Sequence, residues 1–234
     1  PSSMPLSLTS KDYDFCAMIP LQAAKSLTDL PRVKKVILGG ASIDGELEAK
    51  LQNISTEVYS SYGMTETISH IAMRRVNHTM EHETTYKAMP NVTFTQDERN
   101  CLVINAPLIA DHPVITNDIV NLISHSEFEW LGRFDNIINS GGFKVFPESV
   151  EHKIKKYIKG DYFITKEPDD ELGQRAVLYV QGEEKDYPTL AHDIYMDKDM
   201  LKYEVPRQIY FVPKFVYTDN QKLRRDETVK KYKK

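Results

Sequence analysis

Two short stretches of the sequence combine the residue types that phosphate chemistry needs. The first reads Tyr62-Gly63-Met64-Thr65-Glu66. Glu66 offers a carboxylate of the kind that Mg²⁺ prefers as a ligand, and the neighbouring Thr65 hydroxyl can donate a hydrogen bond to a phosphate oxygen. On residue types alone, the better explanation of Glu66 is an acid at the start of a helix, where the helix dipole stabilises a carboxylate.

The second stretch, residues 132–145, reads Gly-Arg-Phe-Asp-Asn-Ile-Ile-Asn-Ser-Gly-Gly-Phe-Lys-Val. Arg133 and Asp135 lie two residues apart, so in an extended backbone both side chains point to the same face. Gly141-Gly142 allows the chain to turn with positive φ or to approach a ligand closely. On spacing alone, a β-hairpin with Ser-Gly-Gly in its turn explains the stretch equally well.

Taken together, the two stretches carry a family resemblance. Residues 132–144 resemble the Gly-Arg-x-Asp…Gly-Gly-x-Lys signature of the adenylate-forming superfamily of acyl-CoA synthetases, adenylation domains and luciferases, and residues 62–66 resemble its Tyr-Gly-Met-Thr-Glu motif. Within the superfamily, residues 65–69 and 132–151 are most similar to the o-succinylbenzoate-CoA ligases of menaquinone synthesis. The resemblance implies an AMP-forming acid-CoA ligase that uses ATP, Mg²⁺ and coenzyme A, with a carboxylic acid as substrate.

The resemblance also implies a nucleotide site. Its residues would be Gly39, Gly40, Ala41, Tyr62, Gly63, Asp118 and Arg133. Tyr62 would stack on adenine, and Asp118 would accept both ribose hydroxyls; the alternatives are a partly buried core tyrosine and, for Arg133, a surface salt bridge. Asp118 ends Ile115-Thr116-Asn117-Asp118, which resembles the family's Thr-Gly-Asp with Asn in place of Gly. Because Asn tolerates positive φ better than most residues, we expect this departure to be mild.

Catalysis, metal binding and domain movement are assigned by the same resemblance. Glu66 would bind Mg²⁺ and Thr65 a phosphate, and Lys222 would bring a positive charge to the α-phosphate. Lys222 begins a match to the family's Gly-Lys-x-x-Arg element in which Gln221 replaces the glycine. Asp135 matches the hinge, and a last set would line the path of the pantetheine arm of coenzyme A: Gly141, Gly142 and Lys144.

The elements expected to position these residues begin with an alternation of strands and helices. Apolar and β-branched runs predict strands, and apolar residues at helical spacing predict the helices between them. Strand, helix, strand and loop imply a parallel α/β sheet with its ligand at the carboxyl ends of the strands. The predicted strands are 15–19, 33–38 and 57–61, and the predicted helices are 21–30 and 43–51.

A small β-rich subdomain is predicted next, and a separate α+β domain after it. Residues 72–100 are polar and weakly patterned, and the strands that we predict near them are 92–95, 102–104 and 114–119. Beyond these, we predict strands 162–165, 176–181 and 207–212 with helices 148–159, 187–202 and a terminal helix from 222. The expected domains are 1–133, the C-terminal part of an adenylation (AMP-binding) domain, and 134–234, a mobile C-terminal α+β domain.

Composition indicates a globular protein and limits its partners. The chain has 234 residues, 41% hydrophobic and 10% aromatic, and no apolar run approaches the roughly 18 residues of a membrane span. Without such a run or a charged-then-apolar leader, the default expectation is a cytoplasmic protein. Two cysteines without CxxC spacing predict reduced core thiols. The net charge of −4, with little asymmetry along the chain, gives no argument for a nucleic-acid partner, and we expect none. The basic tail from residue 222 is either a solvated helix or a surface for phosphates, and a homodimer stays open.

Two further expectations concern completeness and metal. No glycine-rich phosphate loop is recognisable, so we expect the C-terminal part of a longer ligase that folds alone without turnover. The alternatives are another aryl- or acyl-CoA ligase of the superfamily, or a non-catalytic nucleotide-binding module. His78-Thr79-Met80-Glu81-His82 fits the His-x-x-Glu-His zinc pattern. Because no third ligand is evident, we expect these histidines to be surface or structural residues.

Overall fold

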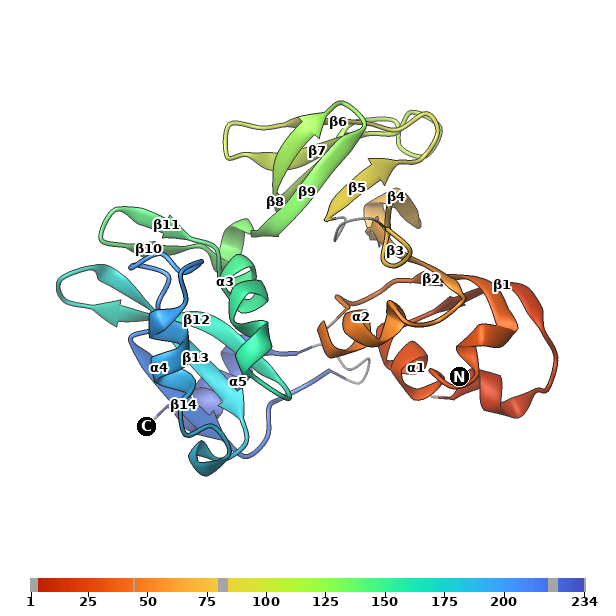
Figure 1. Ribbon diagram of the computed structural model, residues 1–234. Helices are drawn as coiled ribbons and strands as arrows, with labels where there is room; N and C mark the ends of the chain where they lie inside the picture. Colours follow the sequence, from red (N-terminus) through yellow and green to blue (C-terminus); the bar gives the residue numbers. More distant parts are fainter. Residues whose placement is uncertain (1–3, 44, 80–83, 219–222, 234) are drawn as a thin grey trace. The chain divides into compact units, whose positions relative to one another are not determined.

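The chain forms two compact units (Figure 1). The computed structural model describes residues 4–43, 45–79, 84–218 and 223–233. Contacts within the chain divide it into Pro1–Trp130 and Leu131–Lys234, called unit 1 and unit 2 below. Each unit is described by itself. Whether the functional domains meet at residues 133 and 134, as the sequence predicts, stays a prediction.

Unit 1 begins with the predicted alternation of strands and helices. Three neighbouring strands run parallel, with Val36 of the second beside Cys16 of the first and Val58 of the third. They are β1 (Tyr13–Met18), β2 (Val33–Leu38) and β3 (Glu57–Gly63), and the helices between them are α1 (Pro20–Lys25) and α2 (Gly45–Leu51). This part of the fold confirms the predicted α/β class.

The parallel strands and both helices share one hydrophobic core. Val36, Leu51 and Val58 are fully buried in it, together with Leu30. Fully burying an aliphatic side chain of this size stabilises the folded state by roughly 1.5–3 kcal/mol. The β-branched run of β2 therefore fixes the strand through side-chain burial as well as through its backbone pairing.

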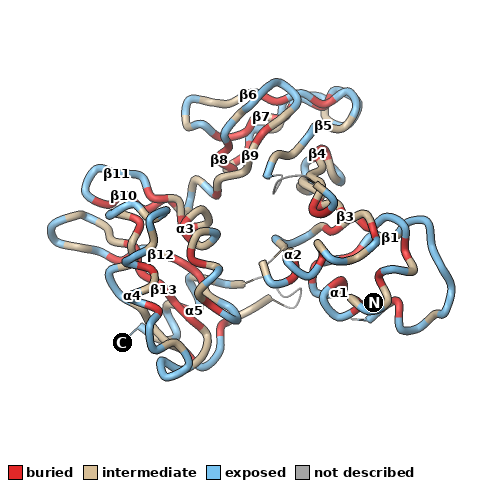
Figure 2. The backbone as a smooth tube through the Cα atoms, viewed as in Figure 1, coloured by how far each residue is buried: buried red, intermediate tan, exposed pale blue. Residues whose placement is uncertain are grey.

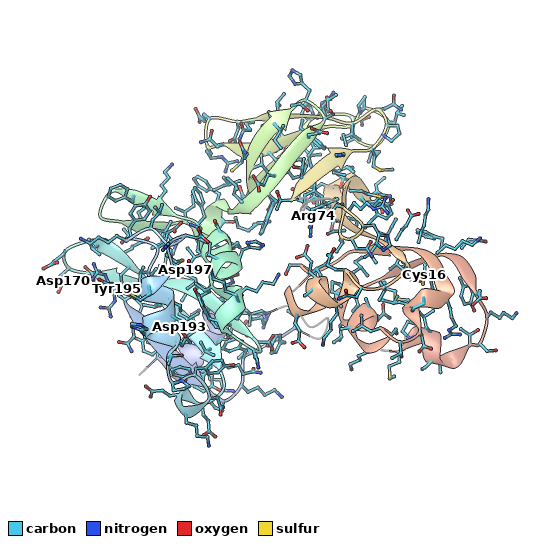
Figure 3. All side chains as sticks on the ribbon, in the orientation of Figure 1. Cys16, Arg74, Asp170, Asp193, Tyr195 and Asp197 are labelled. Carbon is cyan, nitrogen blue, oxygen red and sulfur yellow. The ribbon has the colours of Figure 1, made fainter. Side chains whose placement is uncertain are left out.

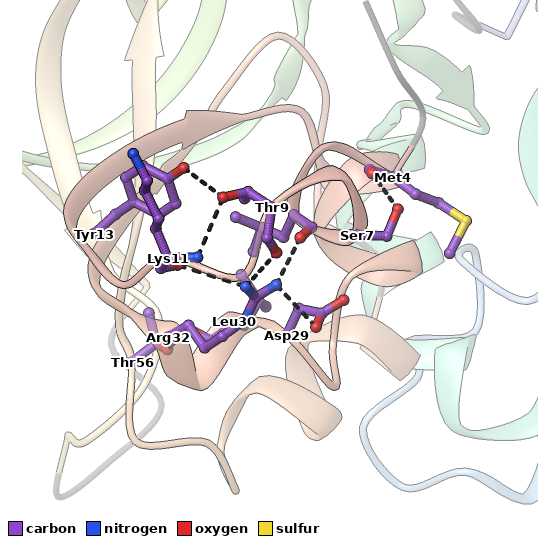
Figure 4. A network of polar contacts seen from close by, with 10 residues as sticks. Met4, Ser7, Thr9, Lys11, Tyr13, Asp29, Leu30, Arg32 and Thr56 are labelled. Carbon is purple, nitrogen blue, oxygen red and sulfur yellow. Dashed lines mark hydrogen bonds and ion pairs between the residues drawn. The ribbon is translucent and has the colours of Figure 1, made fainter.

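Arg32 holds the first described residues onto this core (Figure 4). Its Nη2 donates to the Leu6 carbonyl at 2.6 Å and its Nη1 to the Thr9 carbonyl at 2.5 Å. Asp29 accepts from the same guanidinium at 3.0 Å. A charged donor to a backbone carbonyl makes a stronger hydrogen bond than a neutral one. The Arg32 side chain alone therefore holds the backbone at Leu6 and at Thr9 in place.

The rest of unit 1 is antiparallel and continues the same sheet. The strand order is β1-β2-β3-β4-β5-β9-β8-β7-β6. The added strands are β4 (His70–Arg75), β5 (Thr85–Ala88), β6 (Thr93–Gln96), β7 (Cys101–Asn105), β8 (Val114–Ser124) and β9 (Glu127–Arg133), of which the last three residues belong to unit 2. They enclose a second core around Phe94, Leu102 and Phe128. The predicted β-rich subdomain is thus built on the edge of the parallel strands.

Sequence analysis predicted no strand where β4 and β5 lie, because residues 72–100 are polar and weakly patterned. Ile71 and Ala72 are fully buried, but the charged residues that follow hide the strand pattern. Arg74 lies 2.8 Å from the Glu48 carboxylate of α2, with both side chains only 14% exposed, and Figure 3 labels it. The strand is specified by this partner and by pairing with β3, neither of which is visible locally in the sequence.

The described residues of unit 2 form a small sheet with three α-helices. Its strands are β10 (Ile138–Ser140), β11 (Phe143–Val145), β12 (Tyr162–Asp169), β13 (Gly173–Gln181) and β14 (Gln208–Val212), and its α-helices are α3 (Pro147–Ile154), α4 (Leu190–Met196) and α5 (Arg225–Tyr232). The sheet order is β11-β10-β13-β12, and β14 pairs with β13 in parallel. Residues 176–180 of β13 are all buried, as the red segment in Figure 2 shows.

Short 3-10 helices connect these elements. They are η1 (Pro5–Leu8), η2 (Leu30–Arg32), η3 (Thr65–Thr67), η4 (Phe134–Asn136), η5 (Lys155–Tyr157) and η6 (Glu184–Asp186). Several predicted helices are shorter than expected. The predicted helix 187–202 is limited to α4 because Asp197, labelled in Figure 3, leaves helical geometry at ψ 119° and accepts the Asp199 N–H at 3.0 Å. An aspartate that bonds its own following backbone favours a turn over a helix.

Candidate functional site

The carboxyl ends of β2 and β3 bring the first group of predicted residues together. Gly39 N donates to the Met18 carbonyl of β1 at 3.1 Å. The Gly39–Ala41 segment therefore leaves the carboxyl end of β2 directly beside the end of β1. A Cβ atom on Gly39 would lie 2.5 Å from the Ser61 hydroxyl of β3. This edge of a parallel sheet is where α/β folds place their ligands.

Tyr62 and Asp118, which are 56 residues apart, meet in a short hydrogen bond. The Tyr62 hydroxyl, at the end of β3, donates to Asp118 Oδ2 of β8 at 2.6 Å. Asp118 is only 5% exposed. A short hydrogen bond to a buried carboxylate is stronger than one between neutral groups, so it fixes both side chains. The two residues that the resemblance assigns to adenosine therefore form one arrangement.

The ring of Tyr62 is part of an aromatic cluster. It meets Phe128 edge-on with a centroid distance of 5.1 Å, and Tyr86 lies 5.8 Å away at a tilt. Phe94 completes the cluster through an edge contact with Phe128 at 5.0 Å. Tyr62 is thus partly buried against the second core, as the alternative interpretation expected, and stacking on adenine stays a prediction.

Asp118 is presented by an irregular part of β8. In the pairing with β7, Cys101 faces Ile119 but Val103 faces Ile115, so three residues of β8 lie opposite the single Leu102. Inside this bulge, Thr116 Oγ1 accepts the Asp118 N–H at 3.0 Å. Bulges re-aim side chains, and this one turns Asp118 toward Tyr62.

Asn117 corrects one step of the sequence argument. We expected Asn117 to adopt the positive φ of the glycine that it replaces before Asp118. Asn117 lies inside strand β8 and does not have positive φ, in contrast to Asn91 and Asn100. The position therefore needs no glycine, and the departure from Thr-Gly-Asp is tolerated because the backbone is extended there.

The turn that carries Thr65 and Glu66 is short and well fixed. Both residues are exposed in η3, so Glu66 lies in the first turn of a helix, as residue types alone suggested, and this helix is a short 3-10 helix. The buried Thr67 hydroxyl accepts the Met64 N–H at 3.0 Å and donates within the turn to Ser69 O at 2.9 Å. The backbone is thereby held while the Glu66 carboxylate faces solvent.

Ile68 follows in an uncommon conformation. Its φ of 63° and ψ of −51° make it the central residue of a γ-turn, closed by Ser69 N donating to Thr67 O at 2.6 Å. Its side chain is 80% exposed. A β-branched residue with positive φ is a backbone outlier, and such outliers gather at ligand sites.

Gly63 is required by packing within the same motif. A Cβ atom there would lie 2.1 Å from the Ser69 carbonyl oxygen and 2.8 Å from His70 Cα. Both atoms belong to backbone and cannot rotate away. The glycine of the Tyr-Gly-Met-Thr-Glu motif thus lets β4 return closely against the end of β3, with His70 paired opposite Gly63.

A magnesium ion fits Glu66 only as a shared ligand. Among the residues that the structure describes, no three His, Cys, Asp or Glu side chains converge in a way that could hold a metal ion. Mg²⁺ is commonly bound through one or two carboxylates, with substrate phosphates and water completing its octahedron. The single exposed Glu66 carboxylate suits an ion that arrives with a nucleotide.

The second group of predicted residues lies in unit 2. Arg133 ends β9 and Asp135 lies in η4, so they are not in one extended segment as the spacing argument assumed. They still form an ion pair, with Arg133 Nη2 3.6 Å from Asp135 Oδ2, and both are well exposed. An exposed pair of this kind contributes roughly 0–1 kcal/mol to stability.

Gly141 and Gly142 form the turn of a β-hairpin. Ser140 of β10 pairs with Phe143 of β11, and the two glycines between them have φ of 58° and 88°. Two successive positive φ values define the tight turn that matches strand twist. Lys144 follows on β11 with an exposed side chain. The hairpin explanation is correct for the backbone, while the path of coenzyme A stays a prediction.

A buried charged network ties α5 to α3. Arg225 Nη1 and Nη2 each lie 2.9 Å from an oxygen of Glu151, and the Ile164 N–H donates to the same carboxylate at 2.7 Å. Glu148 lies 3.8 Å from Arg225 and accepts from Asn136 of η4 at 2.5 Å. Burial raises the pKa of Glu151 to about 7, against the lowering effect of Arg225 and the Ile164 N–H.

The predicted site residues therefore fall into two described groups and one that is not described. In unit 1, Tyr62 and Asp118 are in contact, and the sheet edge places Gly39–Ala41 beside β3. In unit 2, Arg133 and Asp135 form an ion pair. Lys222 lies outside the described residues, as do Gln221 before it and His82 of the zinc pattern.

Sequence analysis missed Arg99. The side chain reaches from the β6–β7 turn to the bulge of β8, where it donates to Asn117 Oδ1 at 2.9 Å and to the Thr116 carbonyl at 3.0 Å. The local sequence Asp-Glu-Arg-Asn is typical of a solvated turn. No pattern in the sequence links residue 99 to residue 117.

No family model matches the chain. Among curated proteins, it is 34% identical over 123 residues to a medium/long-chain-fatty-acid–CoA/3-oxocholest-4-en-26-oate–CoA ligase of Mycobacterium tuberculosis (strain CDC 1551 / Oshkosh), which covers 52% of this chain and 22% of that protein. It is 23% identical over 217 residues to a 2-succinylbenzoate–CoA ligase of Staphylococcus aureus (strain JH9), covering 83% of this chain and 44% of that protein. The chain thus spans less than half the length of these relatives. Within the described residues, no helix is both long and apolar enough to cross a bilayer.

Solved structures give the same result. An acyl-CoA synthetase (AMP-forming)/AMP-acid ligase II-like protein from Dyadobacter fermentans DSM 18053 is 33% identical with a TM-score of 0.57, over 99% of this chain and 69% of that one. The o-succinylbenzoate coenzyme A synthetase of Bacillus subtilis, in complex with ATP and magnesium, has a TM-score of 0.71 at 18% identity, over 92% and 51%. The fold, the two motifs and these similarities agree: the chain belongs to the AMP-forming acyl-CoA synthetases of the adenylate-forming superfamily.

Proposed function

We propose that the protein is an ATP-dependent acid-CoA ligase, and that its acid is o-succinylbenzoate. The observation that carries the nucleotide part is the 2.6 Å hydrogen bond between Tyr62 and Asp118 beside the turn of Thr65 and Glu66. It joins residues from two distant motifs at the sheet edge where ligands bind. The match to 2-succinylbenzoate–CoA ligase, which extends over 83% of this chain, supports the choice of acid.

In this proposal Asp118 and Tyr62 hold the adenosine. An ionised carboxylate has about four acceptor positions, so Asp118 can accept the Tyr62 hydroxyl and the two ribose hydroxyls together. Tyr62 offers its ring to adenine, and the Gly39–Ala41 backbone passes the base closely. Because Asp118 is buried, its hydrogen bonds to ribose are poorly screened by water and therefore strong.

The phosphates lie at the turn of η3 in this proposal. The substrate carboxylate attacks the α-phosphate and pyrophosphate leaves; the thiol of coenzyme A then attacks the acyl carbonyl and AMP leaves. Thr65 donates to a phosphate oxygen and Glu66 ligates Mg²⁺, which when bound neutralises charge on the phosphates. Lys222 supplies a further cation in the first step. The Thr67 hydrogen bonds keep Thr65 and Glu66 in place during both steps.

Residues 134–234 form the mobile domain in this proposal, with Asp135 as the hinge. Gly141, Gly142 and Lys144 line the path of the pantetheine arm. The exposed tight turn at Gly141-Gly142 supports this role, because a backbone without Cβ atoms admits a narrow chain closely. The proposed compartment is the cytoplasm, and the free thiols of Cys16 and Cys101 support it.

The test is coenzyme A-dependent AMP release by the full-length protein over a panel of acids. The panel contains o-succinylbenzoate, benzoate and a medium-chain fatty acid, with Asp118→Asn as the inactive reference. We expect o-succinylbenzoate to give the highest kcat/KM by at least about tenfold, equal to roughly 1.4 kcal/mol of transition-state discrimination. If the fatty acid gives a higher kcat/KM than o-succinylbenzoate, the proposed substrate is wrong. AMP binding without AMP release for any acid would leave only a nucleotide-binding module.

A further inference from the structure

We propose that Arg99 is a positioning residue for Asp118, holding open the β8 bulge that aims this carboxylate at Tyr62 and the ribose. The inference rests on the proposed function for the identity of the ligand. Its structural part concerns only unit 1. Arg99 reaches the bulge through the Thr116 carbonyl and the Asn117 side chain, the two residues directly before Asp118, so its effect passes through this backbone segment.

The first step of the argument is the bulge itself. A regular antiparallel pairing that begins with Cys101 opposite Ile119 would place residue 117 opposite Val103, but Val103 faces Ile115. Residues 116–118 therefore lie opposite Leu102 alone, and β8 contains two residues more than the ladder needs. Backbone groups in such a bulge lose their cross-strand partners and must find others.

The second step is that Arg99 supplies those partners. Its Nη2 donates to the Thr116 carbonyl at 3.0 Å, and its Nη1 donates to the Asn117 side-chain oxygen at 2.9 Å. On the other side of the residue, Thr116 Oγ1 accepts the Asp118 N–H at 3.0 Å. The guanidinium therefore takes the place that a β7 backbone N–H would hold in a regular ladder.

The third step is that Arg99 is itself fixed. Asp97 Oδ2 accepts from Arg99 Nε at 2.8 Å and lies 2.7 Å from Nη2, while Asp97 Oδ1 accepts the backbone N–H groups of Arg99 and Cys101 at 2.8 and 2.9 Å. Every nitrogen of the guanidinium has a partner. A planar, doubly bonded arginine loses little further freedom when it also binds the bulge, so it can impose a geometry.

Asn117 fits this arrangement as well. At this position the residue contributes an amide oxygen to Arg99, which glycine could not do. The substitution that looked like a departure from Thr-Gly-Asp is thus matched by a cation on the neighbouring turn. Loss of the cation would leave the buried Thr116 carbonyl without this donor and let the bulge relax, which moves the Asp118 carboxylate away from Tyr62.

The experiment compares the binding of AMP and 2′,3′-dideoxy-AMP to residues 1–234 by calorimetry. The ratio of the two dissociation constants measures hydrogen bonding to the ribose, independently of overall affinity. Arg99→Met is the test variant and Asp118→Asn the reference. The matched control is Arg75→Met, because Arg75 belongs to the same unit and has the same side-chain exposure of 33%. A second readout, the Tyr62 Cζ chemical shift without ligand, reports the hydrogen bond to Asp118.

We expect the wild-type ratio to be tenfold or more, and Asp118→Asn to reduce it to about one. Arg99→Met should reduce it to threefold or less and shift the Tyr62 Cζ signal in the direction seen for Asp118→Asn. Arg75→Met should change neither. Adding Arg99→Met to Asp118→Asn should change the ratio no further, because both act through one carboxylate.

The outcomes separate the two proposals. If Asp118→Asn leaves the ratio unchanged, the ribose role of Asp118 is wrong, whatever Arg99 does. If Asp118→Asn abolishes the ratio while Arg99→Met preserves both the ratio and the Tyr62 signal, the positioning role is overturned. Should Arg99→Met not fold, Arg99→Lys decides, since a lysine keeps the charge beside Asp97 but cannot reach both acceptors. An undiminished ratio in Arg99→Lys also overturns the inference.

Discussion

At the residue scale, the motif glycines differ in what they do. Gly63 is needed because the Ser69 carbonyl oxygen, just before β4, lies within 2.1 Å of where its Cβ would be. Gly142 has nothing within 4 Å of that position, and only its φ of 88° favours glycine. One glycine is thus required for packing and the other for conformation. The distinction predicts different effects for the same substitution.

Gly63→Ala should destabilise the protein by about 2–4 kcal/mol, because the backbone atoms of Ser69 and His70 must move to admit a methyl group. Gly142→Ala should cost only about 1–2 kcal/mol, the usual penalty of a left-handed conformation for a residue with a Cβ. Urea unfolding followed by circular dichroism measures both. Equal losses in the two variants would show that the approach of β4 to Gly63 is not as close as described.

Features of the fold and the site that depend on neighbouring residues in the sequence were largely predictable. The run Val33–Leu38 was predicted as a strand with its observed bounds, because its β-branched residues favour an extended backbone whatever lies around them. Tyr62 and Asp118 were named separately, but their contact could not be predicted. It depends on a bulge opposite Leu102 and on Arg99, and both are properties of strands that meet only in the folded chain.

At the element scale, α3, β12 and α5 are joined through one buried carboxylate. Glu151 of α3 binds Arg225 at the start of α5 and the Ile164 N–H of β12. Because burial outweighs these partners, the pKa of Glu151 is raised from 4.5 to about 7. The folded state therefore binds more protons than the unfolded state between these two pH values.

It follows that the free energy of unfolding falls as pH rises from about 4.5 to about 7, with a slope of at most roughly 1.4 kcal/mol per pH unit from this group. The stabilisation is fully present below the lower value and lost above the higher one. Hydrogen exchange at the Ile164 amide measures it. Glu151→Gln should remove this part of the slope, and a slope that persists unchanged in that variant would assign it to other groups.

At the scale of the whole molecule, the hinge prediction connects the two units. Lys166 Nζ donates to the carbonyls of Asp135 and Ile137, each at 3.3 Å. The backbone of η4 is thus held by two long hydrogen bonds from one flexible side chain. A lysine on a flexible stem suits a segment that adopts two conformations. With the sequence match at Asp135, we propose that these two hydrogen bonds break when φ and ψ change there.

Asp135→Pro should block one half-reaction more than the other. Proline fixes φ near roughly −65° and restricts the preceding Phe134, so the segment loses one of its conformations. Pyrophosphate exchange reports the first half-reaction, and conversion of supplied acyl-AMP reports the second. Asp135→Ala, which leaves the backbone free, is the control. An equal loss of both half-reactions would make the residue merely structural.

Lys222→Ala should slow acyl-AMP formation by about 10²-fold or more, corresponding to roughly 2.7 kcal/mol of lost charge stabilisation. Thioester formation from supplied acyl-AMP should persist, since the lysine is proposed to act only in the first step. Lys214→Ala is the neighbouring control, an exposed lysine outside the motif. Near wild-type pyrophosphate exchange in Lys222→Ala would place residue 222 in a solvated tail.

The γ-turn at Ile68 is a point at which the native state carries conformational strain. A β-branched residue held at φ 63° raises the energy of the native state by about 1–3 kcal/mol. Ile68→Gly should relieve this strain, lose only about 0.5–1 kcal/mol through added freedom of the unfolded chain, and lose almost no burial from a side chain that is 80% exposed. We therefore expect a thermally more stable variant with a looser turn beside Glu66. A lower melting temperature would show that the exposed isoleucine contributes more than its surroundings in the folded chain suggest.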